Sequence, residues 1–264
     1  MDQNRPIGIF DSGVGGLSVL QKIRNCLPNE ALLYVADSGY APYGDRSVAF
    51  ITSRSFIITK FLLEHDVKAI VVACNTATAV AITLLRKRFD LPIIGIEPAL
   101  KPAVTITRSG AIGILATGST VRSNKFTALL NHYKHLALII VQPCPGLAEC
   151  VENGELNSPH VIALLEAFIR PLLAYGVDTI VLGCTHYPFL MPLIRQLTGP
   201  KVLILDSSDA VALYLRSRLT SAGLLASNTN IGMERYFTSG ALEKVASLIG
   251  RLLGNQLTVE YLPF

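Results

Sequence analysis

The chain has 264 residues, of which 50% are hydrophobic and 16% are charged, so it has enough apolar material for one large domain or two of ordinary size. This composition excludes an intrinsically disordered protein. The net charge of +4 is spread along the chain. The tightest basic cluster, residues 86–88, is predicted to be the cation-rich end of a helix rather than a nucleic-acid site.

The sequence has no signal for a membrane, a leader peptide or a structural metal. No apolar run approaches the ~18 residues of a membrane-spanning helix, and MDQNRPIGIF passes directly into a predicted strand without the h-region of a signal peptide. The five cysteines form no CxxC pair, which argues against a disulfide framework and a zinc site. We therefore expect a cytoplasmic protein with reduced thiols, bound to no metal, membrane or nucleic acid.

Apolar, β-rich runs alternate with amphipathic stretches along most of the chain. Strands are expected at residues 7–10, 32–35, 69–73, 93–96, 111–115, 137–141, 179–182 and 202–205. These runs are uniformly apolar rather than alternating, which is typical of parallel strands covered on both faces. After the sixth run, Ser158 and Pro159 are predicted to open a helix that Pro171 kinks and Gly176 closes. The pattern predicts an α/β protein.

The first four predicted strands recur in the second half of the chain at a nearly constant offset. IGIFDSG (7–13) resembles IGILATGS (112–119), and AIVVACNTA (69–77) resembles TIVLGCTHY (179–187). The ordered set predicts two similar lobes, each a mainly parallel sheet flanked by helices. We assign residues 1–97 and 207–264 to the first lobe and residues 98–206 to the second.

Polar residues follow the first and third strand of each predicted lobe. In open α/β sheets, ligands bind beyond the carboxyl ends of the strands, so facing lobes would bring these residues to one cleft. They are Asp11, Ser12, Cys74, Asn75, Thr76, Thr117, Cys184, Thr185 and His186. We therefore predict an active site in the cleft between the lobes.

The glycine-rich stretch DSGVGGLS (11–18) follows the first strand, and Asp37 ends the second, which resembles a dinucleotide-binding pattern. However, Ser18 stands where the third glycine belongs, Asp11 would face the pyrophosphate, and the stretch contains no P-loop lysine. A tight turn whose backbone amides face a small anion at a helix N-terminus is the preferred interpretation.

Cys74 and Cys184 occupy equivalent places in the two halves, each followed by a polar pair and a predicted helix. A helix N-terminus stabilises a thiolate, whereas Cys26, Cys144 and Cys150 are expected to be ordinary buried residues. A disulfide would be transient in a reducing cytosol, zinc would need more ligands, and acyl transfer would leave one thiol idle. Two-base proton transfer uses both thiols, since one removes a proton from carbon and the other delivers a proton to the opposite face.

The residues beside these thiols fit an amino-acid substrate. The neutral groups suited to its carboxylates are Ser12, Asn75, Thr76, Thr117 and Thr185. Asp11 could hold an ammonium group or assist a thiol, and His186 is predicted to modulate Cys184. Glu152 could play the same part for the other thiol, although periodicity alone predicts a loop carboxylate there.

Seven motifs between residues 7 and 190 carry a family resemblance. They are IGIFDSGVGGLSV (7–19), YVADSGYAPYG (34–44), VVACNTATA (71–79), IIGIEPALKPA (93–103), IGILATGSTVRS (112–123), CPGLAECVENGE (144–155) and VLGCTHYPFL (181–190). Together they resemble the glutamate racemase branch of the aspartate/glutamate racemase family. The resemblance implies that Cys74 and Cys184 are the acid/base thiols, with Glu152 as a helper. It also implies a glutamate site lined by Asp11, Ser12, Tyr43, Gly44, Asn75, Thr76, Thr185 and His186.

Members of the glutamate racemase branch interconvert L- and D-glutamate without pyridoxal phosphate, supply D-glutamate for peptidoglycan synthesis and are usually dimeric. The resemblance therefore implies a cofactor-independent, homodimeric isomerase whose small-molecule partner is glutamate. A racemase for aspartate or another acidic amino acid is the alternative within enzymes. A non-catalytic, two-lobed binding protein of the periplasmic type is the alternative outside them.

Overall fold

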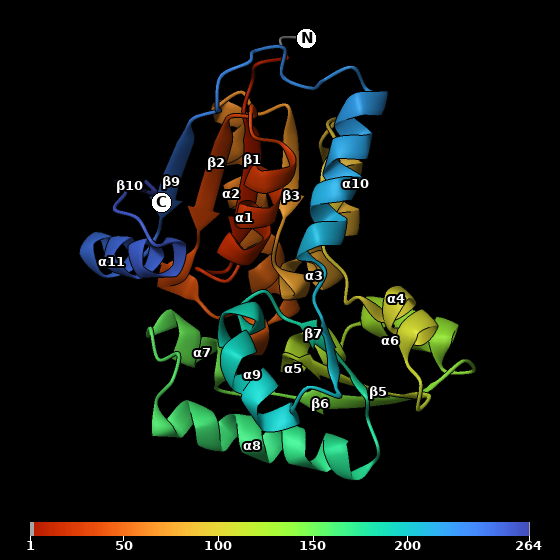
Figure 1. Cartoon of the computed structure of the whole chain (residues 1–264). Helices are drawn as coiled ribbons and strands as arrows, with labels where there is room; N and C mark the ends of the chain where they lie inside the picture. Colours follow the sequence, from red (N-terminus) through yellow and green to blue (C-terminus); the bar gives the residue numbers. More distant parts are fainter. Residues whose placement is uncertain (1–2, 264) are drawn as a thin grey trace.

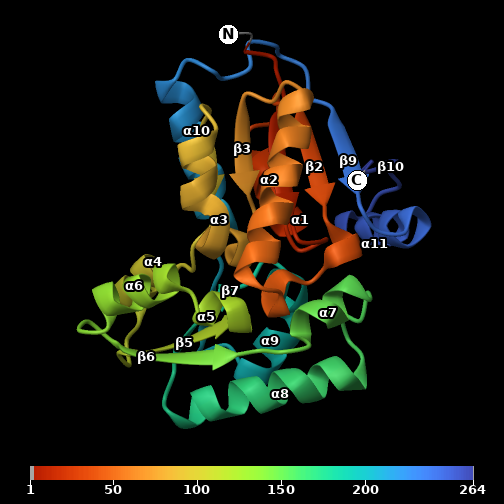
Figure 2. The ribbon, with the colours of Figure 1, turned by 180° about the vertical axis from the view of Figure 1, so that it is seen from behind.

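The computed structural model describes residues 3–263, whose ten strands form two parallel sheets with helices around both (Figures 1 and 2). Residues 1, 2 and 264, which the predicted first lobe includes, lie outside the described residues. The expected α/β class is confirmed. No helix within residues 3–263 has both the length and the apolar character needed to cross a membrane.

All strand pairs in both sheets are parallel. The first sheet has the order β10-β9-β2-β1-β3-β4, and the second has the order β6-β5-β7-β8. The strands of the first sheet are β1 (Ile7–Asp11), β2 (Leu32–Ala36), β3 (Ala69–Val72), β4 (Ile93–Gly95), β9 (Glu234–Thr238) and β10 (Val259–Tyr261). Those of the second are β5 (Ala111–Ala116), β6 (Leu138–Pro143), β7 (Thr179–Gly183) and β8 (Leu203–Leu205).

The predicted repeat is present in the strand order, because β2-β1-β3-β4 in one sheet matches β6-β5-β7-β8 in the other. Each predicted strand lies within two residues of an observed one. The strands β9 and β10 were not predicted, because β9 begins with the charged Glu234 and Arg235 and β10 is a three-residue edge strand. Both belong to the first sheet, and the lobe boundaries at residues 97 and 207 stay a prediction.

Helices cover both faces of each sheet (Figures 1 and 2). On the first sheet, one face carries α1 (Leu17–Cys26), α10 (Ser208–Ser221) and α11 (Leu242–Leu253), and the other carries α2 (Val48–Glu64) and α3 (Asn75–Arg88). On the second, one face carries α7 (Leu147–Glu152), α8 (Pro159–Ala174) and α9 (Met191–Thr198). The other carries α4 (Leu100–Ile106), α5 (Gly118–Val121) and α6 (Asn124–Tyr133).

Successive side chains of the central strands enter different cores. Ile9 packs in the cluster beneath α1 and α10, whereas Phe10 packs in the cluster beneath α2 and α3. The first of these clusters continues into α7, α8 and α9, so the two lobes share one apolar core. The edge strands β6 and β8 are exceptions to the expected two-sided burial, since Leu138 is 57% and Leu203 is 43% exposed.

The structure confirms the predicted helix ends of α8 and the basic last turn of α3. Ser158 caps α8 by accepting a hydrogen bond from the Val161 amide at 3.3 Å, with Pro159 at the first helical position. Gly176, just beyond the helix, has a φ of +73°, which glycine adopts without strain. The basic residues 86–88 form the last turn of α3, as expected.

The carboxyl ends of β1, β2 and β3 point towards the second lobe (Figure 1). The chain passes between the lobes after β4 and returns after β8. These two crossing segments are tied together, since the Ser207 hydroxyl donates to the Glu97 carbonyl oxygen. The crossings therefore lie side by side, and the polar strand ends of one lobe face those of the other.

Asp178, just before β7, ties residues 107–109 to the start of that strand. Its carboxylate accepts hydrogen bonds from Thr107 Oγ1 at 2.6 Å, Arg108 N at 2.8 Å and Ser109 N at 2.7 Å. Thr179 Oγ1 donates a further bond at 2.9 Å. Burial alone would raise the pKa of Asp178, but these hydrogen bonds outweigh it and hold the pKa well below its ordinary value.

We expect Asp178→Asn to lower the free energy of unfolding at pH 7 by about 1–3 kcal/mol, because an amide cannot accept all four bonds. Since the folded-state pKa lies below the unfolded value of about 3.9, this stabilisation is present above about pH 4 and is lost as the pH falls through the folded pKa. Urea unfolding at pH 7 and pH 3 measures the change.

The control is Asp209→Asn, which loses only an exposed ion pair with Lys22 at 3.0 Å. It should change the free energy of unfolding by less than about 0.5 kcal/mol. A loss in Asp178→Asn that is the same at both pH values would contradict the role assigned to its charge.

Candidate active site

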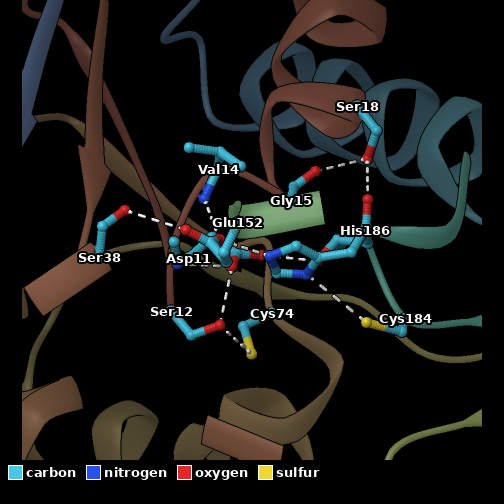
Figure 3. A network of polar contacts seen from close by, with 12 residues as sticks. Asp11, Ser12, Val14, Gly15, Ser18, Ser38, Cys74, Glu152, Cys184 and His186 are labelled. Carbon is cyan, nitrogen blue, oxygen red and sulfur yellow. Dashed lines mark hydrogen bonds and ion pairs between the residues drawn. The ribbon is translucent and has the colours of Figure 1, made fainter. Parts of the chain in front are cut away.

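The two thiols singled out in the sequence lie at strand ends, one in each lobe, near the contacts that join the lobes (Figure 3). Cys74 follows β3 and is the N-cap of α3, where its sulfur accepts a hydrogen bond from the Ala77 amide at 3.4 Å. Cys184 follows β7 in the other sheet. Both are free thiols, 5% and 7% exposed respectively. They are thus buried, unoxidised and held by equivalent strands.

Cys74 is connected to Asp11 through one hydroxyl group. Its sulfur lies 3.8 Å from Ser12 Oγ, and that hydroxyl donates to Asp11 Oδ1 at 3.0 Å. Burial, together with the negative charge of Asp11, raises the pKa of Cys74 to about 12. At neutral pH the Cys74 side chain is therefore a thiol.

Asp11 connects the two lobes. Its buried carboxylate accepts hydrogen bonds from the Gly13 amide at 3.0 Å and from Thr185 Oγ1, in the second lobe, at 2.7 Å. Burial raises the pKa of Asp11, and the nearby charge of His186 lowers it only in part. Ser18 makes a second link between the lobes, because its hydroxyl lies 3.0 Å from the Thr185 carbonyl oxygen.

Cys184 is paired with a histidine instead of a hydroxyl group. His186 Nδ1 lies 3.6 Å from the sulfur, and His186 Nε2 lies 2.6 Å from Glu152 Oε1. Burial alone would lower the pKa of His186, but the hydrogen bonds to Cys184 and Glu152 outweigh it and raise the pKa well above its ordinary value. As an imidazolium, His186 donates from both nitrogens and stabilises negative charge on the Cys184 sulfur.

Glu152 is the last residue of α7, not the loop carboxylate that periodicity indicated. Its carboxylate accepts hydrogen bonds from the Val14 amide at 2.7 Å and from Ser38 Oγ at 3.3 Å, both in the first lobe (Figure 3). The sequence assigned Glu152 to the Cys74 side. It lies on the Cys184 side, because α7 ends against the turn after β1, where His186 also packs.

The glycine-rich turn after β1 is explained by this close approach. A Cβ atom on Gly13 would lie 1.9 Å from Glu152 Oε1, and one on Gly15 would lie 2.3 Å from His186 Nδ1. The anion that the turn's amides face is therefore the protein's own Glu152 carboxylate, on the Val14 amide. These glycines make room for the second lobe, which is a different use from a dinucleotide turn.

Three threonine hydroxyls from the two lobes form a cluster. Thr76 Oγ1 lies 2.9 Å from Thr117 Oγ1 and 3.2 Å from Thr120 Oγ1. Thr120 was not predicted, although it stands three residues after Thr117 and its amide donates to the Thr117 hydroxyl at 3.4 Å, as in a helix cap. Beside the cluster, Asn75 is 4% exposed, and within residues 3–263 no group accepts a hydrogen bond from its Nδ2.

Tyr43 and Gly44 lie on the loop after β2, in the short 3₁₀ turn Tyr43–Asp45. The Tyr43 hydroxyl donates to Asp37, so the structure does not direct that hydroxyl to either thiol. The Gly44 carbonyl oxygen accepts a hydrogen bond from Ser119 Oγ of the second lobe at 2.6 Å. Neither Ser38 nor Ser119 was singled out in the sequence, since nothing local marks a serine that reaches across to another lobe.

The assembled site has two thiols in opposite electrostatic environments, flanked by hydroxyl groups and one unpaired amide. No group of three or more His, Cys, Asp or Glu side chains in the described part of the chain is arranged to hold a metal ion. Cys74 is suited to give a proton, and Cys184, beside an imidazolium, is suited to take one. Cys144 and Cys150 are buried, as expected, whereas Cys26 is only partly buried, and none of the three takes part in the hydrogen bonds described above.

The chain is similar to known racemases over nearly its whole length. A profile of the Asp/Glu/Hydantoin racemase family matches residues 7–215. A glutamate racemase of Ectopseudomonas mendocina is 50% identical over 261 residues, which are 98% of this chain and 99% of the relative. A glutamate racemase from Bacillus anthracis has a similar structure, with a TM-score of 0.91, 36% identity and 99% and 98% of the two chains covered. A glutamate racemase from Francisella tularensis, solved in complex with D-glutamate, has a TM-score of 0.85, 27% identity and 98% coverage of both chains.

Proposed function

We propose that this chain, which belongs to the Asp/Glu/Hydantoin racemase family, interconverts L- and D-glutamate by proton transfer at the α-carbon. The glutamate racemases to which it is similar cover nearly its full length, which favours glutamate over aspartate as the substrate. As the resemblance implies, the D-glutamate formed would be used in peptidoglycan synthesis. We also propose a cytoplasmic homodimer that needs no cofactor.

The observation that carries this proposal is the unequal environment of two equivalent thiols. Two-base racemisation needs one thiolate and one thiol at the same time, on opposite faces of the substrate carbon. Burial and Asp11 keep Cys74 protonated, whereas the His186 imidazolium donates to the sulfur of Cys184. In the proposed mechanism, Cys74 therefore gives a proton, and the sulfur of Cys184, next to His186 Nδ1, takes one.

In one direction, the Cys184 thiolate takes the α-proton, and the electron pair of the broken C–H bond remains on the α-carbon. Cys74 then gives its proton to the opposite face, so that an S–H bond breaks as the new C–H bond forms. Cys74 ends as the thiolate and Cys184 as the thiol, which is the arrangement that the reverse reaction needs. The Ser12 hydroxyl and the Ala77 amide stabilise negative charge on the Cys74 sulfur, and His186 with Glu152 stabilises it on the Cys184 sulfur. Asp11 favours the return of a proton to Cys74.

The substrate contacts follow from the unpaired and exchangeable groups between the thiols. Within residues 3–263, Asn75 Nδ2 has no acceptor. The hydroxyls of Thr76 and Thr117 lie 2.9 Å from each other, so a glutamate carboxylate gives each of these groups an ionised partner. Thr185 already donates to the Asp11 carboxylate, and this pair is suited to the α-amino end of the substrate. Binding between the lobes excludes water and strengthens these polar contacts.

The function is tested by incubating the purified protein, without added cofactor, with L-glutamate and separately with L-aspartate. Circular dichroism should decay to zero for glutamate and change little for aspartate. In deuterium oxide, the recovered glutamate should carry deuterium at the α-carbon. Stable optical activity together with tight glutamate binding would identify a binding protein instead, and faster loss with aspartate would favour the alternative racemase.

Cys74→Ala and Cys184→Ala should each abolish racemisation, with a fall in kcat of at least about 10³-fold, because each removes one of two groups that act as a unit. Each variant keeps one base, so it should still eliminate chloride from one enantiomer of β-chloroalanine, and the two variants should prefer opposite enantiomers. Cys150→Ala, which removes a buried thiol outside the site, is the control. A Cys74→Ala enzyme that racemises glutamate at a near-normal rate would disprove the two-base mechanism.

Glu152→Gln should move the alkaline limb of the kcat/KM profile to lower pH. The Glu152 carboxylate helps to raise the pKa of His186, so its removal brings that pKa towards the ordinary value of about 6.5. The imidazolium is then lost at a lower pH, and activity at pH 8 should fall by about 10-fold or more. Glu149→Gln removes the same charge from the same helix without a hydrogen bond to His186. Equal shifts in both variants would point to a general charge effect.

A further inference from the structure

The proposed mechanism does not use Asp37, a fully buried carboxylate directly after β2. It accepts two hydrogen bonds from Arg54 of α2, from Nε at 2.9 Å and from Nη2 at 2.7 Å. Its other donors are Ser239 Oγ, at 2.7 Å, and the Tyr43 hydroxyl. Four segments of the first lobe therefore meet at one carboxylate, which is also the residue that the dinucleotide pattern had brought to attention.

A buried ion pair of this kind defines geometry more strictly than it adds stability. Removing two charges from water is costly, and the attraction between them roughly offsets that cost. The pair fixes the orientation of both side chains, because the planar Arg54 guanidinium meets the Asp37 carboxylate through two parallel hydrogen bonds. The Arg54 guanidinium also lies 3.9 Å from the ring centre of Tyr40, and this cation–π contact holds Tyr40 against α2.

Residues 38–45, which we name the rim loop, reach from this network to the second lobe. At one end, Ser38 Oγ donates to Glu152 Oε2 at 3.3 Å. At the other, the Gly44 carbonyl oxygen accepts a hydrogen bond from Ser119 Oγ at 2.6 Å. Pro42, Gly44 and Asp45 also line a small pocket opposite Thr117 and Cys144. The loop thus contacts both the Glu152–His186 pair and the threonine cluster.

We propose that Asp37, Arg54 and Tyr43 form a positioning network that holds the rim loop against the second lobe during racemisation. The network keeps the Ser38 hydroxyl on Glu152, which orients His186 towards Cys184, and keeps Gly44 beside Thr117. None of the three acts on the reacting atoms through this network. The inference rests on the proposed racemase function, since it assigns these residues to the alignment of that site.

The sharpest variant is Arg54→Lys, which keeps the charge but loses one of the two parallel bonds. It should lower kcat/KM for glutamate by about 10- to 100-fold, because small displacements of catalytic groups have effects of this size. The matched control is Arg24→Lys. Arg24 pairs with Glu234 at 2.6 Å in a partly buried contact of the same lobe, and neither residue touches the rim loop. The control should change kcat/KM by less than about 2-fold.

A double-mutant cycle separates positioning from a general loss of stability. In the Ser38→Ala/Ser119→Ala background, the rim loop has lost both hydrogen bonds to the second lobe. Arg54→Lys should then cost less than about 3-fold in kcat/KM, since residues that act through shared contacts are not additive. If Arg54→Lys does not fold, as judged by thermal unfolding, Ser239→Ala removes a single bond from Asp37 and is carried through the same cycle.

The outcomes distinguish this inference from the proposed function. A wild-type protein that does not racemise glutamate would overturn the proposed function and this inference with it. Wild-type racemisation with equal losses in Arg54→Lys and Arg24→Lys would overturn only the positioning role. The positioning role would also be overturned if Arg54→Lys lowered kcat/KM by the same factor in the Ser38→Ala/Ser119→Ala background as in the wild type. A reduced loss in that background, with the control unaffected, supports the network.

Discussion

The contact between the two lobes depends on the carboxylate of Glu152, which accepts hydrogen bonds from both lobes at once. It ends α7 in the second lobe, accepts the Val14 amide of the first lobe at 2.7 Å and pairs with His186 at 2.6 Å. Because this pair is largely shielded from water, its contribution is less screened than that of a surface ion pair. Gly13 and Gly15 must lack side chains for the contact to form, and the charge on His186 depends on it.

Two sheets with the same strand order hold sulfur atoms at equivalent positions, but the neighbours of the two sulfurs differ. The repeat provides the opposed geometry, with Cys74 after β3 and Cys184 after β7. The two sulfurs differ in the side chain that each contacts: Cys74 lies next to the Ser12 hydroxyl, and Cys184 lies next to the His186 imidazole. A fully symmetric pair would have equal proton affinities. On the proposed function, this departure from symmetry lets one thiol be charged while the other is not.

The strands of the repeat and the pair of thiols could be predicted from the sequence, because short stretches of residues determine them. Apolar β-branched runs revealed the strands of the repeat, and the matching places of Cys74 and Cys184 revealed the pair. The contacts of Glu152 could not be predicted, because they depend on how α7 lies against a turn more than 130 positions away in the chain. For the same reason Ser38 was missed, since its partner belongs to the other lobe. The strand β9 was missed because its first two residues are charged, and their partners, Arg24 and Glu260, are also distant in sequence.

Among the contacts between the lobes are weak polar ones that, on the proposed function, a substrate can replace. Thr76 and Thr117 meet hydroxyl to hydroxyl at 2.9 Å, and a carboxylate is a stronger acceptor for each than the other hydroxyl. Asn75, on the same helix as Thr76, has a buried amide nitrogen that finds no acceptor among residues 3–263, and burying an unpaired donor costs free energy that a ligand carboxylate would offset. The Asp37 network, by contrast, is buried in the first lobe and its hydrogen bonds lie within that lobe. On the proposed function, the contact between the Thr76 and Thr117 hydroxyls can therefore exchange for glutamate while the Asp37 network keeps the rim loop in position.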